Sequence, residues 1–134
     1  MNDYTKLIKL AIGAKEFSYS PYSKFRVGAA ILAEDGEMFS GCNIENASYG
    51  ATNCAERTAI FKGVSQGVKK IKAIAITSDQ EDFIYPCGIC RQVLREFGKD
   101  IDIILINAKG ETKQSSIAEL LPNEFTKTSV KFKL

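Results

Sequence analysis

Residues 71–106 read IKAIAITSDQEDFIYPCGICRQVLREFGKDIDIILI, and this stretch decides the fold. Its first part, Ile71–Thr77, alternates and is rich in β-branched residues, which predicts a strand. Pro86 suits the first turn of a helix that runs to about Phe97. Ile101–Ile106 is a continuous apolar run, which is typical of a strand buried on both faces. A strand–helix–strand unit of this kind predicts two parallel strands joined by a right-handed crossover.

The residues before this unit predict a helix followed by a hairpin. Apolar residues recur at helical spacing from Asp3 onward, with Asn2 or Asp3 as the N-cap. Arg26–Ala33 and Met38–Cys42 are short runs of strand character. Asp35-Gly36 between them is a turn signal typical of an antiparallel hairpin.

The remaining elements complete an α/β pattern. Asn53 to about Val64 predicts a second helix, Thr112–Ser115 a short edge strand, and Ser116-Ile-Ala-Glu119 a capping box that opens a last short helix. The order predicts a three-layer α/β/α architecture with a mixed five-stranded sheet, antiparallel in its opening hairpin and then parallel. Residues 1–134 are expected to form a single domain, because this length suits one hydrophobic core.

Composition excludes several functional classes. The chain has 134 residues, of which 45% are hydrophobic and 25% charged, and its net charge is +2. Both signs of charge are interspersed, so no basic face indicates a nucleic-acid partner. The longest apolar runs are strand-sized, too short to span a membrane. The opening Met-Asn-Asp does not resemble a signal peptide, which favours a cytoplasmic location.

The four cysteines fall into an informative pattern. In a reducing compartment, cysteines are more often metal ligands or buried thiols than disulfides, although a disulfide remains the alternative. Cys54-Ala-Glu56 and Pro86-Cys87-Gly-Ile-Cys90 supply three thiols that can hold one zinc ion and leave its fourth position open. The chain contains no histidine, so the carboxylate of Glu56 is the candidate for proton transfer beside that position.

Other interpretations compete with this one. Glu56 also has the position of a capping-box partner for Asn53, a purely structural role. Cys42 is either a small buried residue or the fourth ligand of a closed, structural Cys₄ site. Arg57 is expected to donate to the thiolate sulfurs, as residues around metal ligands do. For Arg91 the sequence leaves open a similar role or a solvated surface position, the commoner fate of arginine.

Five segments of the chain, taken together in this order, match a known pattern. From about Tyr4 to Phe125 the sequence resembles the small, zinc-dependent cytidine deaminases, and this implies their fold and a zinc cofactor. The matching segments are Pro21–Ala30, Gly41–Ala47, Cys54–Ala59, Pro86–Val93 and Glu119–Pro122.

The resemblance implies an activity and a role for each residue of the cysteine pattern. The activity is the hydrolytic deamination of cytidine and 2′-deoxycytidine to uridine and 2′-deoxyuridine with release of ammonia, a step of pyrimidine salvage. Cys54, Cys87 and Cys90 are expected to bind Zn²⁺. Glu56 is expected to carry a proton to ring N3 and then to the departing amine, as in zinc deaminases generally.

The resemblance also implies a substrate pocket and an assembly. Asn43 and Glu45, with Ile44 between them, are expected to hold the ribose hydroxyls, and Phe25 to line the pyrimidine pocket. Phe125 is expected to reach the active site of a neighbouring subunit. The short length and the cysteine at position 54 imply the homotetrameric class, whose active sites are shared between subunits; Tyr49 stays unassigned.

Two other activities share part of this signature. A deaminase of a cytosine-containing antibiotic such as blasticidin S has the same zinc and glutamate motifs but does not need the ribose-binding segment, which this chain has at Asn43–Glu45. A polynucleotide deaminase is disfavoured, because no basic or aromatic-interleaved stretch is present to hold a strand. The expected partner is therefore a small nucleoside, with neither nucleic acid nor membrane.

Overall fold

The computed structural model describes residues 3–129, which build one mixed sheet of five strands. The strands are β1 (Val27–Ala33), β2 (Met38–Cys42), β3 (Ile71–Ser78), β4 (Asp102–Ile106) and β5 (Thr112–Ser116). Their order across the sheet is β2-β1-β3-β4-β5. The β3–β4 pair is parallel, as the opening stretch predicts, and the other neighbouring pairs are antiparallel.

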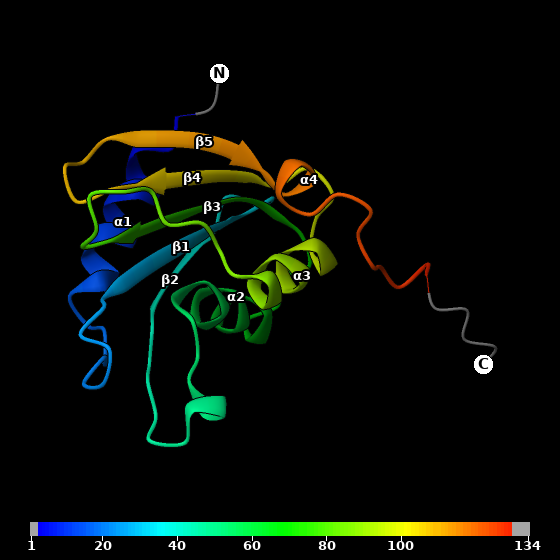
Figure 1. Ribbon diagram of the computed structural model, residues 1–134. Coiled ribbons are helices and arrows are strands. Elements are labelled where there is room, and N and C mark those ends of the chain that lie inside the picture. Colours follow the sequence, from blue (N-terminus) through cyan, green and yellow to red (C-terminus); the bar gives the residue numbers. More distant parts are fainter. Residues whose placement is uncertain (1–2, 130–134) are drawn as a thin grey trace.

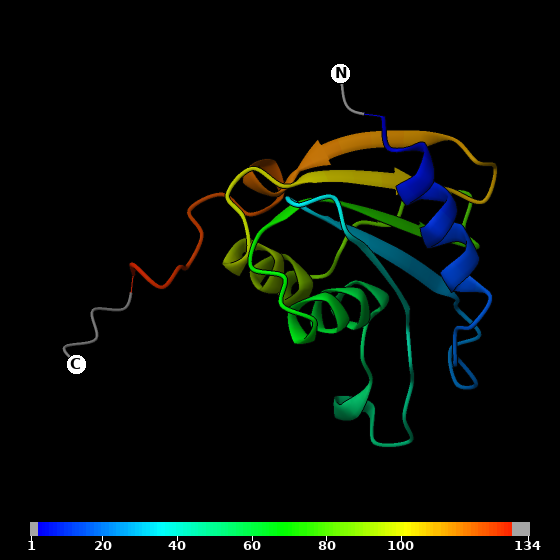
Figure 2. The same ribbon diagram turned by 180° about the vertical axis from the view of Figure 1, so that it is seen from behind.

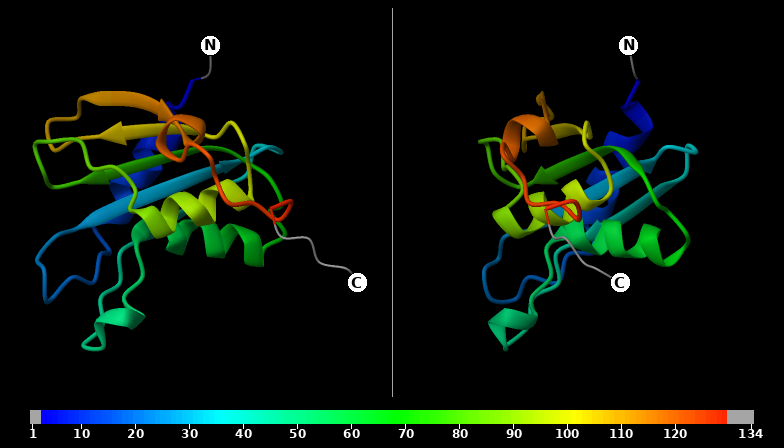
Figure 3. Two further views of the ribbon diagram at one scale, coloured as in Figure 1. Left: turned by 45° about the vertical axis from the view of Figure 1, so that its right-hand side comes forward. Right: turned by 90° about the vertical axis from the view of Figure 1, so that its right-hand side faces the viewer.

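Helices cover both faces of the sheet, which confirms the expected three-layer architecture. Helix α1 lies on one face, and α2 and α3 lie side by side on the other (Figures 1 and 2). The views in Figure 3 separate these layers. The helical segments are α1 (Thr5–Lys15), η1 (Tyr49–Ala51), α2 (Ala55–Ser65), α3 (Gly88–Glu96) and α4 (Ile117–Leu120).

Strand β3 carries side chains of different size on the two faces of the sheet. On β3, Ala73 and Ala75 pack in the cluster under α1, whereas Ile74 and Ile76 pack in the cluster under α2 and α3. Strand residues alternate between faces, so a run buried on both sides must be apolar throughout. This is why β1, β3 and β4 appear in the sequence as nearly continuous apolar segments.

The helix starts differ in detail from the sequence prediction. Helix α1 has Tyr4 as its N-cap, and the Asp3 carboxylate accepts the Thr5 N–H at 2.9 Å; Asn2 lies outside the described residues. Helix α3 begins at Gly88, after Pro86, because Cys87 has extended backbone angles and acts as the N-cap. Helix α2 likewise follows Cys54 as its N-cap.

Gly28 of β1 allows α1 to pack closely on the sheet. A Cβ at Gly28 would lie 2.2 Å from the Ala11 carbonyl oxygen and 2.6 Å from the Lys15 nitrogen. We therefore expect Gly28→Ala to destabilise the protein by about 3 kcal/mol, the upper range for an overpacked core. The thermal midpoint at a fixed protein concentration measures this effect.

Gly13→Ala is the matched control. Gly13 lies inside α1, and a Cβ there would meet nothing within 4 Å. Replacing a helical glycine by alanine stabilises a helix by up to about 1 kcal/mol. Equal midpoints for the two variants would contradict the close approach of α1 to β1.

Candidate active site

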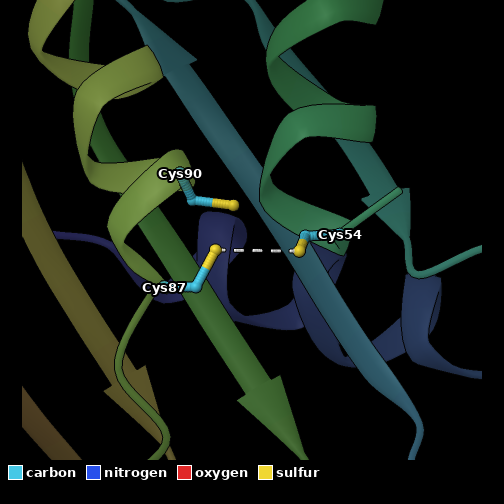
Figure 4. A group of neighbouring side chains, drawn as sticks. All are labelled: Cys54, Cys87 and Cys90. Atoms are coloured by element: carbon cyan, nitrogen blue, oxygen red, sulfur yellow. Dashed lines mark hydrogen bonds between the residues drawn. The ribbon is translucent and has the colours of Figure 1, made fainter. Parts of the chain in front are cut away.

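The topology brings the starts of α2 and α3 to one edge of the sheet. Strands β2 and β3 both pair antiparallel with β1, so they run in the same direction and end at the same edge. The chain continues from β2 to α2 and from β3 to α3. Free N–H groups and the positive ends of both helix dipoles meet there, which favours anionic ligands. Figure 4 shows Cys54, Cys87 and Cys90 projecting from these two helix starts toward one another.

The three sulfurs have the spacing of ligands to one metal ion. The Sγ atoms of Cys54, Cys87 and Cys90 all lie within 4.8 Å of one another. The separation between Cys54 Sγ and Cys87 Sγ is 3.9 Å. Sulfurs bound at about 2.3 Å to a tetrahedral zinc ion lie about 3.8 Å apart. The donor set therefore fits zinc, and the exposure of Cys87 leaves one side of the cluster open.

The surroundings of the cluster favour the thiolate form of Cys54. A hydrogen bond from Cys90, together with the guanidinium of Arg57, lowers the pKa of Cys54 to about 5. Arg57 Nη2 donates to Cys54 Sγ at 3.2 Å, and this contact raises the pKa of Arg57. The hydrogen bond to Cys54 and burial raise the pKa of Cys90, so Cys54 ionises first. Arg57 thus brings one positive charge to the Cys54 thiolate.

Glu56 is buried beside this cluster. It lies in the first turn of α2, and 5% of its surface is exposed. Burial raises the pKa of Glu56 to about 7, and the charge on Cys54 adds to this rise. The alternative capping-box geometry is absent, because the Asn53 N–H donates to the Ile44 carbonyl and Cys54 is the N-cap. A carboxyl group that exchanges a proton near neutral pH suits general acid–base chemistry.

Arg91 holds the backbone around the pair Cys87 and Cys90. Its Nε donates to the Pro86 carbonyl at 2.8 Å, and its Nη1 donates to the Leu120 carbonyl at 2.9 Å. The guanidinium thus ties the residue before Cys87 to the end of α4. This settles the position that the sequence leaves open: Arg91 is partly buried and binds backbone carbonyls.

Cys42 lies apart from the three clustered cysteines. Among the described residues, the group with metal-ligand spacing contains Cys54, Cys87 and Cys90 without Cys42. Cys42 instead lines a cavity of about 510 Å³ between α1, β2 and α2, together with Phe17 and Thr58. Burial raises the pKa of the Cys42 thiol. The geometry therefore opposes a closed Cys₄ site.

The segment Asn43–Glu45 runs directly beside the cluster. Ile44 and Asn53 exchange two backbone hydrogen bonds of 2.9 Å, and Asn53 is the residue before Cys54. On the other side, Tyr19 N–H donates to the Asn43 carbonyl and Glu45 N–H donates to the Tyr19 carbonyl. These bridges fix the expected ribose segment against the start of α2.

The polar side chains of this segment are held by many hydrogen bonds. Asn43 is 8% exposed, and its carboxamide bonds to the backbone of Phe25 and Val27. Glu45 accepts hydrogen bonds from the backbone N–H groups of Tyr22 and Ser23 and from the Ser23 hydroxyl, and the last of these lowers its pKa. An open depression of about 380 Å³ adjoins Glu45. Its lining residues are Tyr22, Ser23, Glu45, Tyr49 and Thr52.

The apolar residues expected at the site differ in how far they are exposed. Phe25 is half-buried and packs against the core, and Ile44 is 45% exposed. Phe125 is 60% exposed, and its carbonyl accepts a hydrogen bond from Gln92 Nε2 in α3. Figures 1 and 3 show the segment after α4 passing α3 toward the C-terminal end of that helix. The Phe125 backbone is thus tied to α3, and its side chain is largely exposed.

Sequence reasoning missed the residues that hold Asn43 and Glu45. Ser18, Tyr22 and Ser23 donate to these two side chains. Tyr22 and Ser23 fall within the matching segment Pro21–Ala30, and this segment could have pointed to them as residues near the site. Ser18 lies outside it, and no local pattern indicates its contact with a residue 25 positions away.

Comparisons with known proteins agree with this site. A family model described as the cytidine and deoxycytidylate deaminase zinc-binding region matches residues 1–106. A cytidine deaminase of Sporosarcina psychrophila is 50% identical over 131 residues, which cover 97% of this chain and 96% of the relative. A blasticidin-S deaminase of Bacillus cereus is 34% identical over 113 residues, covering 78% of this chain and 80% of the relative.

A solved structure extends the similarity to the fold. The crystal structure of a cytidine deaminase from Burkholderia pseudomallei superimposes with a TM-score of 0.88 at 45% sequence identity. The superposition covers 92% of this chain and 100% of that one. The fold expected from the sequence is thereby confirmed.

Proposed function

We propose, since the chain belongs to the cytidine and deoxycytidylate deaminase family, that it catalyses the hydrolytic deamination of cytidine and 2′-deoxycytidine. The products are uridine or 2′-deoxyuridine and ammonia. One observation carries the proposal: the three sulfurs of Cys54, Cys87 and Cys90 meet beside the buried carboxyl of Glu56.

In this proposal, Cys54, Cys87 and Cys90 hold a zinc ion. Their spacing and the donation from Arg57 to Cys54 support this assignment. When bound, zinc supplies Lewis acidity that makes water a nucleophile near neutral pH. Arg57 offsets part of the negative charge of the thiolates, and Arg91 fixes the backbone that carries Cys87.

Glu56 moves the protons of the reaction. Its carboxylate takes a proton from the attacking water and delivers it to N3 of the pyrimidine. It then takes the remaining proton of the oxygen added at C4 and delivers it to the amino group, which departs as ammonia as the C4 carbonyl forms. Its burial beside the cluster supports this role, because a carboxyl group with a pKa near 7 is available in both protonation states at neutral pH.

The segment Asn43–Glu45 binds the sugar. Asn43 and Glu45 hold the ribose hydroxyls beside Ile44, and Phe25 lines the pyrimidine pocket. The backbone bridge between Ile44 and Asn53 supports this arrangement, since it fixes the segment next to Cys54. A carboxylate at the sugar favours a free hydroxyl over a phosphate ester, because like charges repel.

The assembly and location extend the same proposal. Residues 1–134 form one domain of a cytoplasmic homotetramer that acts in pyrimidine salvage, and Phe125 reaches the site of a neighbouring subunit. The exposure of the Phe125 side chain supports this exchange. Free thiolates suit a reducing compartment. Among the described residues, no helix has the length and apolar character needed to cross a membrane.

The substrate is tested by product analysis. Purified protein is incubated with cytidine, 2′-deoxycytidine, free cytosine or blasticidin S, and ammonia and the deaminated product are quantified. We expect one ammonia per uridine from the nucleosides and no turnover of free cytosine, which lacks the sugar that Asn43 and Glu45 bind. Turnover of blasticidin S alone would contradict the proposal and favour the activity named for the Bacillus cereus relative.

A further inference from the structure

The carboxamide of Asn43 has an unusual balance of donors and acceptors. Its Oδ1 accepts the Val27 N–H at 2.9 Å and also the hydroxyl proton of Ser18. Its Nδ2 donates to the Phe25 carbonyl at 2.7 Å. A carboxamide has two oxygen lone pairs and two N–H groups. Within residues 3–129, both lone pairs are thus filled and one N–H has no acceptor, which leaves it for a ligand.

Ser18 is held in place beside Asn43. The neighbouring residue Tyr19 forms a parallel bridge with Ile44, and the Tyr19 N–H donates to the Asn43 carbonyl at 3.0 Å. Ser20 Oγ lies 3.2 Å from Ser18 Oγ. Ser18 has a single hydroxyl proton, so it cannot donate to Asn43 Oδ1 and to Ser20 Oγ at once. The closer contact is the one to Asn43 Oδ1, and the proton goes there.

The side chain of Glu45 offers acceptors where that of Asn43 offers a donor. Its carboxylate takes two backbone N–H groups on Oε1 and the Ser23 hydroxyl on Oε2, and it can offer a ligand only further acceptor positions. A donor-only carboxamide and an acceptor-only carboxylate therefore lie two residues apart on one segment. A sugar hydroxyl, which both donates and accepts, satisfies the two together.

We propose that Ser18 is a positioning residue for substrate binding: by filling the second lone pair of Asn43 Oδ1, it keeps that side chain a donor toward one sugar hydroxyl. Ser18 acts through Asn43 and does not touch the substrate. The inference rests on the proposed function, since it assumes that Asn43 binds the sugar. Without the Ser18 hydroxyl, a buried carbonyl lone pair is left unsatisfied, and the carboxamide has a reason to tilt.

The test combines variants of Ser18 with substrates that lack one hydroxyl. For Ser18→Ala we expect the KM for cytidine to rise about 3- to 10-fold, the net effect of one hydrogen bond, with kcat nearly unchanged. Ser18→Thr keeps the hydroxyl and should restore the KM. Ser65→Ala is the matched control, because the Ser65 hydroxyl donates to the Lys62 carbonyl at the distant end of α2.

The deoxynucleosides separate positioning from a general loss of structure. With 2′-deoxycytidine and 3′-deoxycytidine, the effect of Ser18→Ala should vanish for the analogue that lacks the hydroxyl bound by Asn43 and persist for the other. An equal rise in KM for cytidine and both analogues would overturn the proposal, as would an unchanged KM for cytidine.

A second measurement does not depend on turnover. Hydrogen exchange of the Asn43 side-chain NH₂ group, followed by nuclear magnetic resonance without substrate, should be faster in Ser18→Ala than in the wild type and unchanged in Ser65→Ala. Equal exchange in the wild type and in Ser18→Ala would be enough to overturn the positioning role of Ser18. A wild-type protein that deaminates no nucleoside would instead refute the proposed function, which makes the two failures distinguishable.

Discussion

Glu56→Gln is expected to lower kcat for cytidine by about a thousandfold or more, since general acid–base groups contribute about 10²- to 10⁴-fold. Glutamine has nearly the same size and shape as glutamate, but it can neither take a proton from water nor deliver one to the pyrimidine. The variant should keep its zinc and its fold, because Glu56 is not one of the three clustered cysteines. Steady-state kinetics, zinc analysis and thermal unfolding measure the three properties.

Glu119→Gln is the control for this change. Glu119 also lies in the first turn of a helix, α4, but unlike Glu56 it is exposed. An exposed substitution away from the site should change activity by no more than about twofold. If Glu56→Gln retained wild-type turnover with full zinc content, Glu56 would not be the proton carrier.

The second large effect concerns the metal. Cys90 is fully buried, and its sulfur lies within 4.8 Å of those of Cys54 and Cys87. We expect Cys90→Ser to reduce zinc from about one ion per chain to a trace and to abolish deamination, because a neutral hydroxyl replaces a thiolate in the ligand set. Zinc content after extensive dialysis measures the loss.

Cys42→Ser is the matched control for the metal experiment. It makes the same chemical change at a cysteine that lies apart from the three clustered ones and lines a cavity beside α1. The variant should keep zinc and activity. Zinc loss in Cys42→Ser comparable to that in Cys90→Ser would instead favour the closed Cys₄ site.

Much of the fold follows from local sequence signals. The unit from β3 through α3 to β4 is predicted correctly, since apolar runs buried on two faces and an intervening helix leave few topologies. Helix starts are less predictable. Pro86 suits a first helical turn, yet the helix begins at Gly88, because Cys87 faces its neighbouring sulfurs with extended backbone angles.

In the candidate site, too, the residues with a local sequence pattern could be predicted and the long-range contacts could not. The spacing of Cys54, Cys87 and Cys90 indicates a cluster, because cysteines at helix starts can meet at one sheet edge. Contacts over long sequence distances have no such signature. The bonds from Ser18 to Asn43 and from Arg91 to Leu120 join segments that only the packed fold brings together. For this reason the sequence predicts the ligands of the site better than the residues that orient them.

The most direct test of the account is the zinc dependence of cytidine turnover. The ultraviolet absorbance of cytidine is followed with purified protein, with protein stripped by a chelator, and with stripped protein after zinc is returned. We predict loss of the cytosine band with stoichiometric ammonia, abolished by stripping and restored by zinc. Full turnover by the stripped protein, or none by protein with zinc fully bound, would contradict a zinc-dependent nucleoside deaminase.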